Sequence, residues 1–212
     1  KGIILVEICD KVVCDALSQF NLPIVSVDMP NVPFEELNGI DVVTMESKKN
    51  LKKIINQLIE KGAESFGFVG DLYSPNVSRG FQERYNALSE CLAEHQLPLN
   101  QKNCLLHQTP EDFRNFQTTV NNLQAMISLP DVFICGNDWT AIQLIYALQF
   151  LGFQIPKDIC VVGFDNIPAA SRISPSLTTI STPQKYLGIA AARQILERIQ
   201  HPNCCLLYTS PS

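Results

Sequence analysis

The 212-residue sequence lacks a membrane-spanning run, a secretory signal and a cluster of basic residues. Its longest apolar runs are interrupted by polar residues well before the length that crosses a bilayer, and its first residues, KGIILVEICDK, are typical of a strand rather than of a signal peptide. A net charge of −5 without a Lys/Arg cluster provides no concentrated basic surface for phosphates. We therefore expect no membrane contact, and no DNA contact through these residues.

The sequence also lacks the short motifs of common catalytic and metal sites. It has no C-x-x-C pair, no G-x-x-x-x-G-K-[ST] loop, no G-x-S-x-G elbow and no strand with a D-x-D pair. His95, His107 and His201 share no spacing with one another or with a nucleophile. Several of the eight cysteines lie in apolar patterns, which favours buried free thiols in a reducing cytosol over disulfides. We predict no metal, no cofactor, no enzymatic activity and a cytoplasmic location.

Short apolar runs alternate with helical patterns along the chain, which is typical of parallel β/α units packed in layers. Helical patterns begin at Ser47 and stop at Gly62, cover 140–151, and cover 185–200 with apolar residues every four positions. The predicted strands are Gly2–Val6, Ile24–Val27, Val42–Met45, Phe66–Val69, Cys104–Leu106, Val132–Cys135, Ile159–Phe164 and a short strand in LTTISTP.

Two of these strands end in polar pairs. VFICGND places Asn137 and Asp138 after one strand, and VVGFDN places Asp165 and Asn166 after the next. Ligands of open parallel sheets bind beyond the carboxyl ends of the strands, where an acid is satisfied by ligand or solvent. Asp138 precedes a helix and is interpreted either as its cap or as a ligand contact, whereas Asp165 is followed by no helical pattern, which favours a ligand contact.

These residues belong to a longer stretch, DVFICGNDWTAIQLIYALQFLGFQIPKDICVVGFDNIPAASRISPSLTTISTPQKYLGIAAARQIL, that resembles the effector-binding domain of the LacI/GalR family of bacterial transcription repressors. LPIVSVD, LKKIINQLIEKGAESFGFVG and RYNALSECLAEHQLP extend the resemblance over residues 1–203. It implies an α/β fold of two Rossmann-like lobes with parallel sheets, as in periplasmic binding proteins. The first lobe is expected at 1–63 plus 182–203 and the second at 64–181, with a small molecule in the cleft between them.

The resemblance implies effector contacts from three matching positions, which are Arg84, Asn137 and Asp165. Asp138, beside Asn137, is a further candidate. Arg79, in SRGF, competes with Arg84 for the role of the helix arginine, since the Gly and aromatic residue that usually follow in the family's arginine helix are replaced by alanine and leucine. An arginine with polar and acidic groups around it suits a sugar, whose hydroxyls need donors and acceptors.

Other positions depart from the family pattern. Glu46 stands where the family usually has an aspartate, and Gln108 stands where relatives often have an aromatic residue that stacks on the ligand. The aromatic ring that stacks on the ligand is then expected to come from Phe113, Phe116 or Trp139. Trp139 is also interpreted as a packing residue at the start of its helix.

The resemblance implies a ligand-sensing domain of a cytoplasmic, homodimeric regulator. Effector binding in the cleft would change the lobe arrangement and thereby the spacing of helix-turn-helix headpieces, which contact operator DNA and are not in this sequence. The headpiece, a hinge and the family's first β/α units are missing, so we expect a fragment that is truncated at the N-terminus. The alternative function is a sugar-binding protein of an ABC transport system, which shares the fold.

The last residues do not continue the pattern. CLLYTSPS is what results from translating a common transposon-end sequencing adapter, TGT CTC TTA TAC ACA TCT CCG AGC. We therefore predict that residues 204–212 are a non-native tail and that the C-terminus is truncated as well. The alternative is a genuine short strand, and the codons of the gene distinguish the two.

Overall fold

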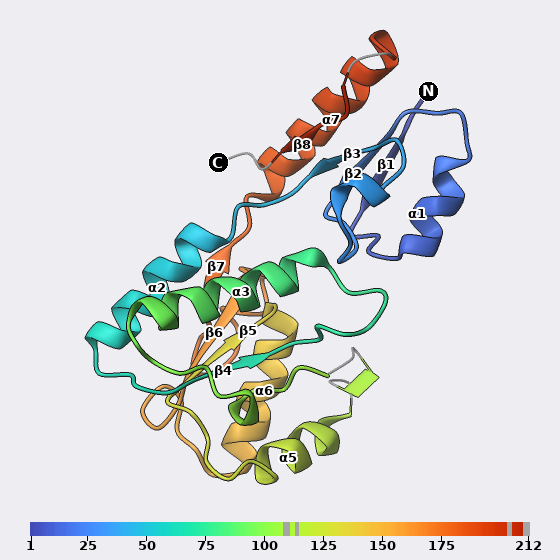
Figure 1. Cartoon of the computed structure of the whole chain (residues 1–212). Helices are drawn as coiled ribbons and strands as arrows, with labels where there is room; N and C mark the ends of the chain where they lie inside the picture. Colours follow the sequence, from blue (N-terminus) through green and yellow to red (C-terminus); the bar gives the residue numbers. More distant parts are fainter. Residues whose placement is uncertain (108–110, 113–114, 203–204, 210–212) are drawn as a thin grey trace. The chain divides into compact units, whose positions relative to one another are not determined.

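The computed structural model describes residues 1–107, 111–112, 115–202 and 205–209. Each of its two compact units contains one four-stranded, wholly parallel sheet (Figure 1), which confirms the predicted α/β class with two parallel sheets. The first unit comprises Lys1–Ser47, Pro75–Gln82 and Pro183–Ser212, and the second comprises Lys48–Ser74 and Glu83–Thr182. The helix over 48–60 thus groups with the second unit, while the family lobe boundaries stay a prediction.

The first unit has the strand order β1-β2-β3-β8. Its elements are β1 (Ile3–Val6), α1 (Lys11–Ser18), β2 (Ile24–Val27), η1 (Phe34–Glu36), β3 (Ile40–Val43), α7 (Gln184–Gln200) and β8 (Tyr208–Thr209). Successive residues of a strand point to opposite faces of the sheet. In β2, Ile24 packs in the same hydrophobic cluster as Cys14 of α1, whereas Val25 packs in the same cluster as Ala191 of α7. Helices α1 and α7 therefore cover opposite faces of this sheet.

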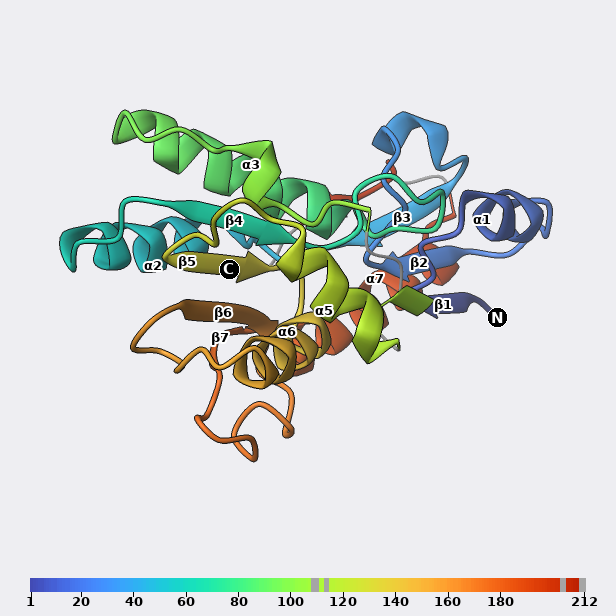
Figure 2. The same cartoon turned by 90° about the horizontal axis from the view of Figure 1, so that it is seen from below.

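The second unit has the strand order β4-β5-β6-β7. Its elements are α2 (Lys48–Glu60), β4 (Phe66–Val69), α3 (Arg79–Glu94, with its first turn grouped with the first unit), η2 (Gln101–Asn103), α5 (Phe116–Gln124), β5 (Val132–Cys135), α6 (Asp138–Phe150), β6 (Cys160–Asp165) and β7 (Thr178–Ser181). Phe68 meets Tyr85 of α3 edge to face, and Val69 packs in the cluster of α5 and α6. Helices α3 and α6 thus lie on opposite faces of the sheet (Figure 2).

The predicted strands agree with the structure except at two places. The third strand was predicted to begin at Val42, because the charged Asp41 interrupts the apolar pattern. In the structure the strand begins at Ile40, and Asp41 is fully buried in it. The segment Cys104–Leu106 is not a strand of its own, and Leu105 makes a single parallel bridge to Val69. The other predicted strands and the three predicted helices are present with shifts of at most two residues at their ends.

Residues 208–209 of the predicted tail form β8, which pairs with β3. Val42 N donates to the Leu207 carbonyl and Thr44 N to the Thr209 carbonyl, both at 2.8 Å. These contacts use backbone atoms, which a chain of almost any sequence offers, so the non-native origin of residues 204–212 stays a prediction.

Candidate functional site

Arg84 reaches the carboxyl edge of the second unit's sheet from helix α3. Its guanidinium carbon lies 3.7 Å from the centre of the Phe164 ring, and its Nη1 donates to the Gly136 carbonyl at 2.5 Å. Phe164 directly precedes Asp165, and Gly136 directly precedes Asn137. The structure thus brings Arg84, Asn137 and Asp165 to one edge, with the guanidinium held by an aromatic face and a backbone acceptor.

Asn137 caps helix α6. Its side-chain oxygen accepts a hydrogen bond from Thr140 N at 2.9 Å, so the alternative that Asp138 is the cap is wrong. Because the oxygen is used by the cap, the amide nitrogen of Asn137 is the group that would meet a ligand, as a donor.

Asp165 ends β6 in an uncommon backbone conformation. Its φ is 107°, that of Asn166 is 54°, and such left-handed angles are rare in residues other than glycine and concentrate at functional sites. Asp165 is half-buried and accepts a hydrogen bond from the Thr182 hydroxyl at 2.9 Å. The carboxylate is therefore oriented by its neighbours at a partly open edge.

The buried side chain of Asp138 holds the loop after β6 in place. It is fully buried, and its two oxygens accept hydrogen bonds from Ile167 N at 2.8 Å and from the Thr179 hydroxyl at 2.5 Å. Gly163 makes room for it, because a Cβ there would lie 2.2 Å from Asp138 Oδ1. Asp138 was a candidate effector contact, and the observed contacts indicate that it positions the loop of Asp165.

We expect Asp138→Ala to lower the free energy of unfolding by about 2–4 kcal/mol, because it removes two hydrogen bonds to a charge and leaves buried donors unpaired. Urea denaturation measures the change. Asp158→Ala, at an exposed carboxylate on the opposite edge of the sheet, is the control and is expected to change much less. A loss below about 1 kcal/mol for Asp138→Ala would contradict the anchoring role.

Two other predicted contacts, Arg79 and Glu46, belong to the first unit. Arg79 Nη1 donates to the Val32 carbonyl at 3.0 Å, and Glu46 is exposed after β3. Their roles toward an effector stay predictions.

The residues predicted to supply an aromatic face differ in their surroundings. Trp139 is 63% exposed at the start of α6, which disagrees with a packing role. Phe116 meets Phe150 edge to face with ring centres 5.5 Å apart. Gln108 and Phe113 lie outside the described residues.

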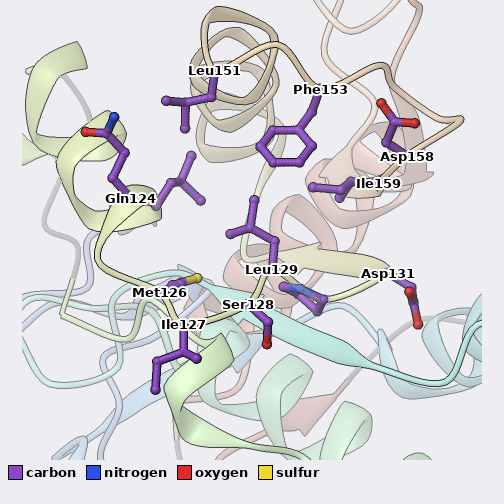
Figure 3. Close-up of a pocket in the computed structure, with 12 residues that line it drawn as sticks. Gln124, Met126, Ile127, Ser128, Leu129, Asp131, Leu151, Phe153, Asp158 and Ile159 are labelled. Atoms are coloured by element: carbon purple, nitrogen blue, oxygen red, sulfur yellow. The ribbon is translucent and has the colours of Figure 1, made fainter.

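A pocket of about 470 Å³ lies at the opposite edge of the same sheet, just before β5 and β6 begin (Figure 3). Its walls are mostly apolar, and its carboxylates are engaged locally: Asp131 accepts from the backbone of Glu64 and Ser65, and Asp158 accepts from Gln154 N. Burial raises the pKa of Asp131, but these backbone bonds and one from the Ser65 hydroxyl outweigh it and lower the pKa overall. The Asp131 carboxylate therefore joins the backbone before β4 to the start of β5, and the Asp158 carboxylate holds its own turn.

The described residues contain little that is typical of catalysis. No group of three or more His, Cys, Asp or Glu among them could hold a metal ion, and the seven described cysteines are free. Burial raises the thiol pKa of six of them, which disfavours the nucleophilic thiolate; these are Cys9, Cys14, Cys91, Cys104, Cys135 and Cys160. Within the same residues, no helix has both the length and the apolar character for crossing a membrane.

The sequence profile of the family of periplasmic-binding-protein-like domains matches residues 55–204, which is well over half of the chain. The chain belongs to this family, as a LacI/GalR effector-binding domain. The predicted membership is thereby confirmed, and the ABC-transport alternative has no support from the relatives found.

Its LacI/GalR relatives include transcription repressors. The chain is 28% identical to the HTH-type transcriptional repressor PurR of Actinobacillus pleuropneumoniae over 91% of the chain and 55% of the relative, and 30% identical to the ribose operon repressor of Haemophilus influenzae over 86% and 52%. A LacI family regulator from Enterococcus faecium with bound ribose superposes with a TM-score of 0.76 at 23% identity, covering 99% of the chain and 74% of that structure. The chain spans about half the length of the curated relatives it matches.

Several residues of this candidate site were missed by the sequence reasoning. Phe164 was interpreted only as a core residue, and Thr179 and Thr182 only as part of a short strand and its exit. A glycine inside an otherwise apolar strand, Gly163, was the signal of a close approach, which proved to be that of Asp138.

Proposed function

We propose that the chain is the ligand-sensing part of a cytoplasmic, DNA-binding transcription regulator and that its effector is a sugar or sugar derivative. The observation that carries this proposal is the position of Arg84, over Phe164 and on the Gly136 carbonyl, beside Asn137 and Asp165. The guanidinium and the Asn137 amide nitrogen donate, and the Asp165 carboxylate accepts. Neighbouring sugar hydroxyls need such a mixture of donors and acceptors.

The proposed action is allosteric and involves no catalysis. A ligand shifts an equilibrium between two arrangements only as far as it binds them differently, and a sugar held at this edge would favour one arrangement of the regulator. Operator DNA would be contacted by a headpiece outside these residues. The name of the ribose operon repressor supports a sugar effector, while contributions of Arg79 and Glu46 to effector binding rest on the family resemblance alone.

A thermal-shift screen of monosaccharides, disaccharides and sugar phosphates tests the proposed function. A ligand that binds the folded chain raises its melting temperature, and at a hundred times its dissociation constant it contributes about 2.7 kcal/mol. We expect a stabilising sugar whose effect is lost in Asp165→Ala. A screen in which no sugar stabilises the chain, or in which Asp165→Ala responds like the wild type, would contradict the proposal.

The regulator is proposed to be a homodimer that uses helices α5 and α6. Helix α5 and residues 139–150 of α6 contain no charged residue, whereas the thirteen residues of α2 include four lysines and one glutamate. On the two helices, Phe116, Tyr146 and Phe150 are 37%, 42% and 67% exposed. Aromatic enrichment with depletion of charge is typical of interface cores, and an uncharged surface can face a second copy of itself without repulsion.

We expect Phe150→Asp to weaken self-association at least about tenfold, because it would bury an unpaired charge in this interface. Sedimentation velocity over a concentration series measures the dissociation constant. Tyr186→Asp in α7 is a matched control, because Tyr186 is also 67% exposed. A wild-type chain that stays monomeric, or equal effects of the two variants, would exclude this interface.

A further inference from the structure

A buried ion pair holds the C-terminal segment, residues 205–209, beside β3. Asp41 of β3 is fully buried and Arg198 of α7 is 8% exposed, and two hydrogen bonds join them. Leu207 N donates to Asp41 Oδ1 at 2.6 Å. Arg198 Nη2 donates to the Cys205 carbonyl at 2.9 Å. The carboxylate therefore receives a hydrogen bond from the segment, and the guanidinium donates one to it.

The segment is held through its backbone atoms. Besides the contacts to the ion pair, Val42 N donates to the Leu207 carbonyl and Thr44 N donates to the Thr209 carbonyl, both at 2.8 Å. A chain of almost any sequence offers these carbonyls and N–H groups, and only proline lacks the N–H. The chemical requirement for docking is therefore an N–H at position 207, and it does not include a particular side chain there.

The side chains of the segment contribute less to docking. Leu206 and Tyr208 are 45% and 42% exposed, and Tyr208 meets Phe34 with ring centres 5.3 Å apart. A hydrogen bond in which one partner is ionised is about twice as strong as one between neutral groups. We therefore assign most of the docking free energy to the backbone contacts with the ion pair and with β3.

Strand β8, within this segment, closes an edge of the first unit's sheet. The strand order is β1-β2-β3-β8, so β3 would be the outer strand without it. Unpaired N–H and carbonyl groups on an outer strand pair readily with other chains. A site that recognises the backbone closes this edge whatever the sequence of the segment. It also explains how a tail of the predicted non-native origin can form β8.

We propose that Asp41 and Arg198 form a binding site for an extended strand, that its occupant is the chain's own C-terminal segment, and that the site recognises the backbone of this occupant. A segment of different sequence is accepted in the same place, provided that position 207 has an N–H. The segment is also accepted as a separate peptide, because the contacts do not involve its covalent link to α7. Both residues belong to the first unit, whereas the main proposed effector contacts belong to the second.

Amide hydrogen exchange in the full chain tests the site. Leu207→Pro removes the N–H that Asp41 accepts, whereas Leu207→Ala keeps it. The reporters are the N–H groups of Val42 and Thr44, which the docked segment protects. We expect both reporters to exchange about 10- to 150-fold faster in Leu207→Pro, because a hydrogen bond to a charged group stabilises the closed state by that factor. Leu207→Ala is expected to exchange at close to the wild-type rate.

The Asp28 N–H is the internal control, because it donates to the Val43 carbonyl on the other side of β3 at 3.0 Å. Its exchange stays slow as long as the first unit is folded. If it accelerates as well, Leu207→Pro has unfolded the unit, and Asp41→Leu/Arg198→Met decides instead. This double variant removes both contacts to the segment without leaving a buried charge, so we expect fast reporters beside a slow Asp28 N–H.

A peptide supplied separately tests the exchange of the occupant. Acetylated residues 205–209 with Cys205→Ser, added to the folded Leu207→Pro chain, are expected to restore slow exchange of the reporters. The peptide is used at millimolar concentration, which is the effective concentration that a short tether provides. A second peptide that also has Leu206→Thr and Leu207→Val is expected to act equally, and one that has Leu207→Pro is expected to have no effect.

Three results would overturn the inference. Reporters that stay protected in Leu207→Pro, or in the double variant where that one decides, would show that the ion pair does not hold the segment. Equal acceleration in Leu207→Ala and Leu207→Pro would show that the side chain is recognised. A folded Leu207→Pro chain that no peptide protects would show that the segment docks only through its link to α7.

Discussion

Replacing Arg198 by alanine lowers the free energy of unfolding of the first unit by about 3–5 kcal/mol, because it leaves a buried carboxylate without its counter-charge. Arg198 binds the fully buried Asp41 with two hydrogen bonds, Nε to Oδ2 at 2.9 Å and Nη2 to Oδ1 at 2.7 Å. Leu207 N also donates to Asp41 Oδ1, at 2.6 Å. Urea denaturation followed by circular dichroism measures the loss.

The double variant Asp41→Leu/Arg198→Met is the informative control. Removing both charges avoids the unpaired buried carboxylate, so we expect it to be much closer to the wild type in stability than Arg198→Ala. A loss below about 1 kcal/mol for Arg198→Ala would show that Asp41 finds water or another partner in the variant.

Asp165→Ala is expected to raise the dissociation constant of the effector about 10- to 150-fold, because a hydrogen bond to a charged group contributes about 1.5–3 kcal/mol. Isothermal titration with the sugar found by thermal shift measures the change. The variant also loses the hydrogen bond from the Thr182 hydroxyl, so its unfolding in urea without ligand is measured alongside to show that it folds.

Asp158→Asn provides the matched control on the opposite edge of the same sheet. Asp158 lines the pocket that precedes β5 and β6, and its carboxylate accepts from Gln154 N. We expect the affinity of this variant to equal that of the wild type. A loss of affinity in Asp158→Asn with none in Asp165→Ala would move the effector to the other edge.

Much of the fold was predictable because its central strands are buried on both faces. All four residues of β4 and of β5 are buried, so each appears in the sequence as an uninterrupted apolar run. Predicted and observed bounds coincide for both strands. The start of β3 was missed for the opposite reason, since the buried Asp41 is indistinguishable from a surface residue until its partner Arg198, 157 residues away, is in place.

The site was predictable in its residue types but not in its contacts. The order of strand and acid in VVGFDN pointed to Asp165, because strand ends of parallel sheets carry ligand groups. That Arg84 covers Phe164 and binds the Gly136 carbonyl depends on packing between elements 52 to 80 residues apart, which has no local pattern. For the same reason Asp138 could not be separated from a ligand contact.

The measurement that tests the central claim most directly is a crystal structure of the chain with the stabilising sugar bound. The account predicts sugar hydroxyls within hydrogen-bond distance of the Arg84 guanidinium and the Asp165 carboxylate, at the carboxyl edge of β5 and β6. A sugar found instead in the pocket bordered by Asp131 and Asp158, at the amino edge of the same strands, would contradict it.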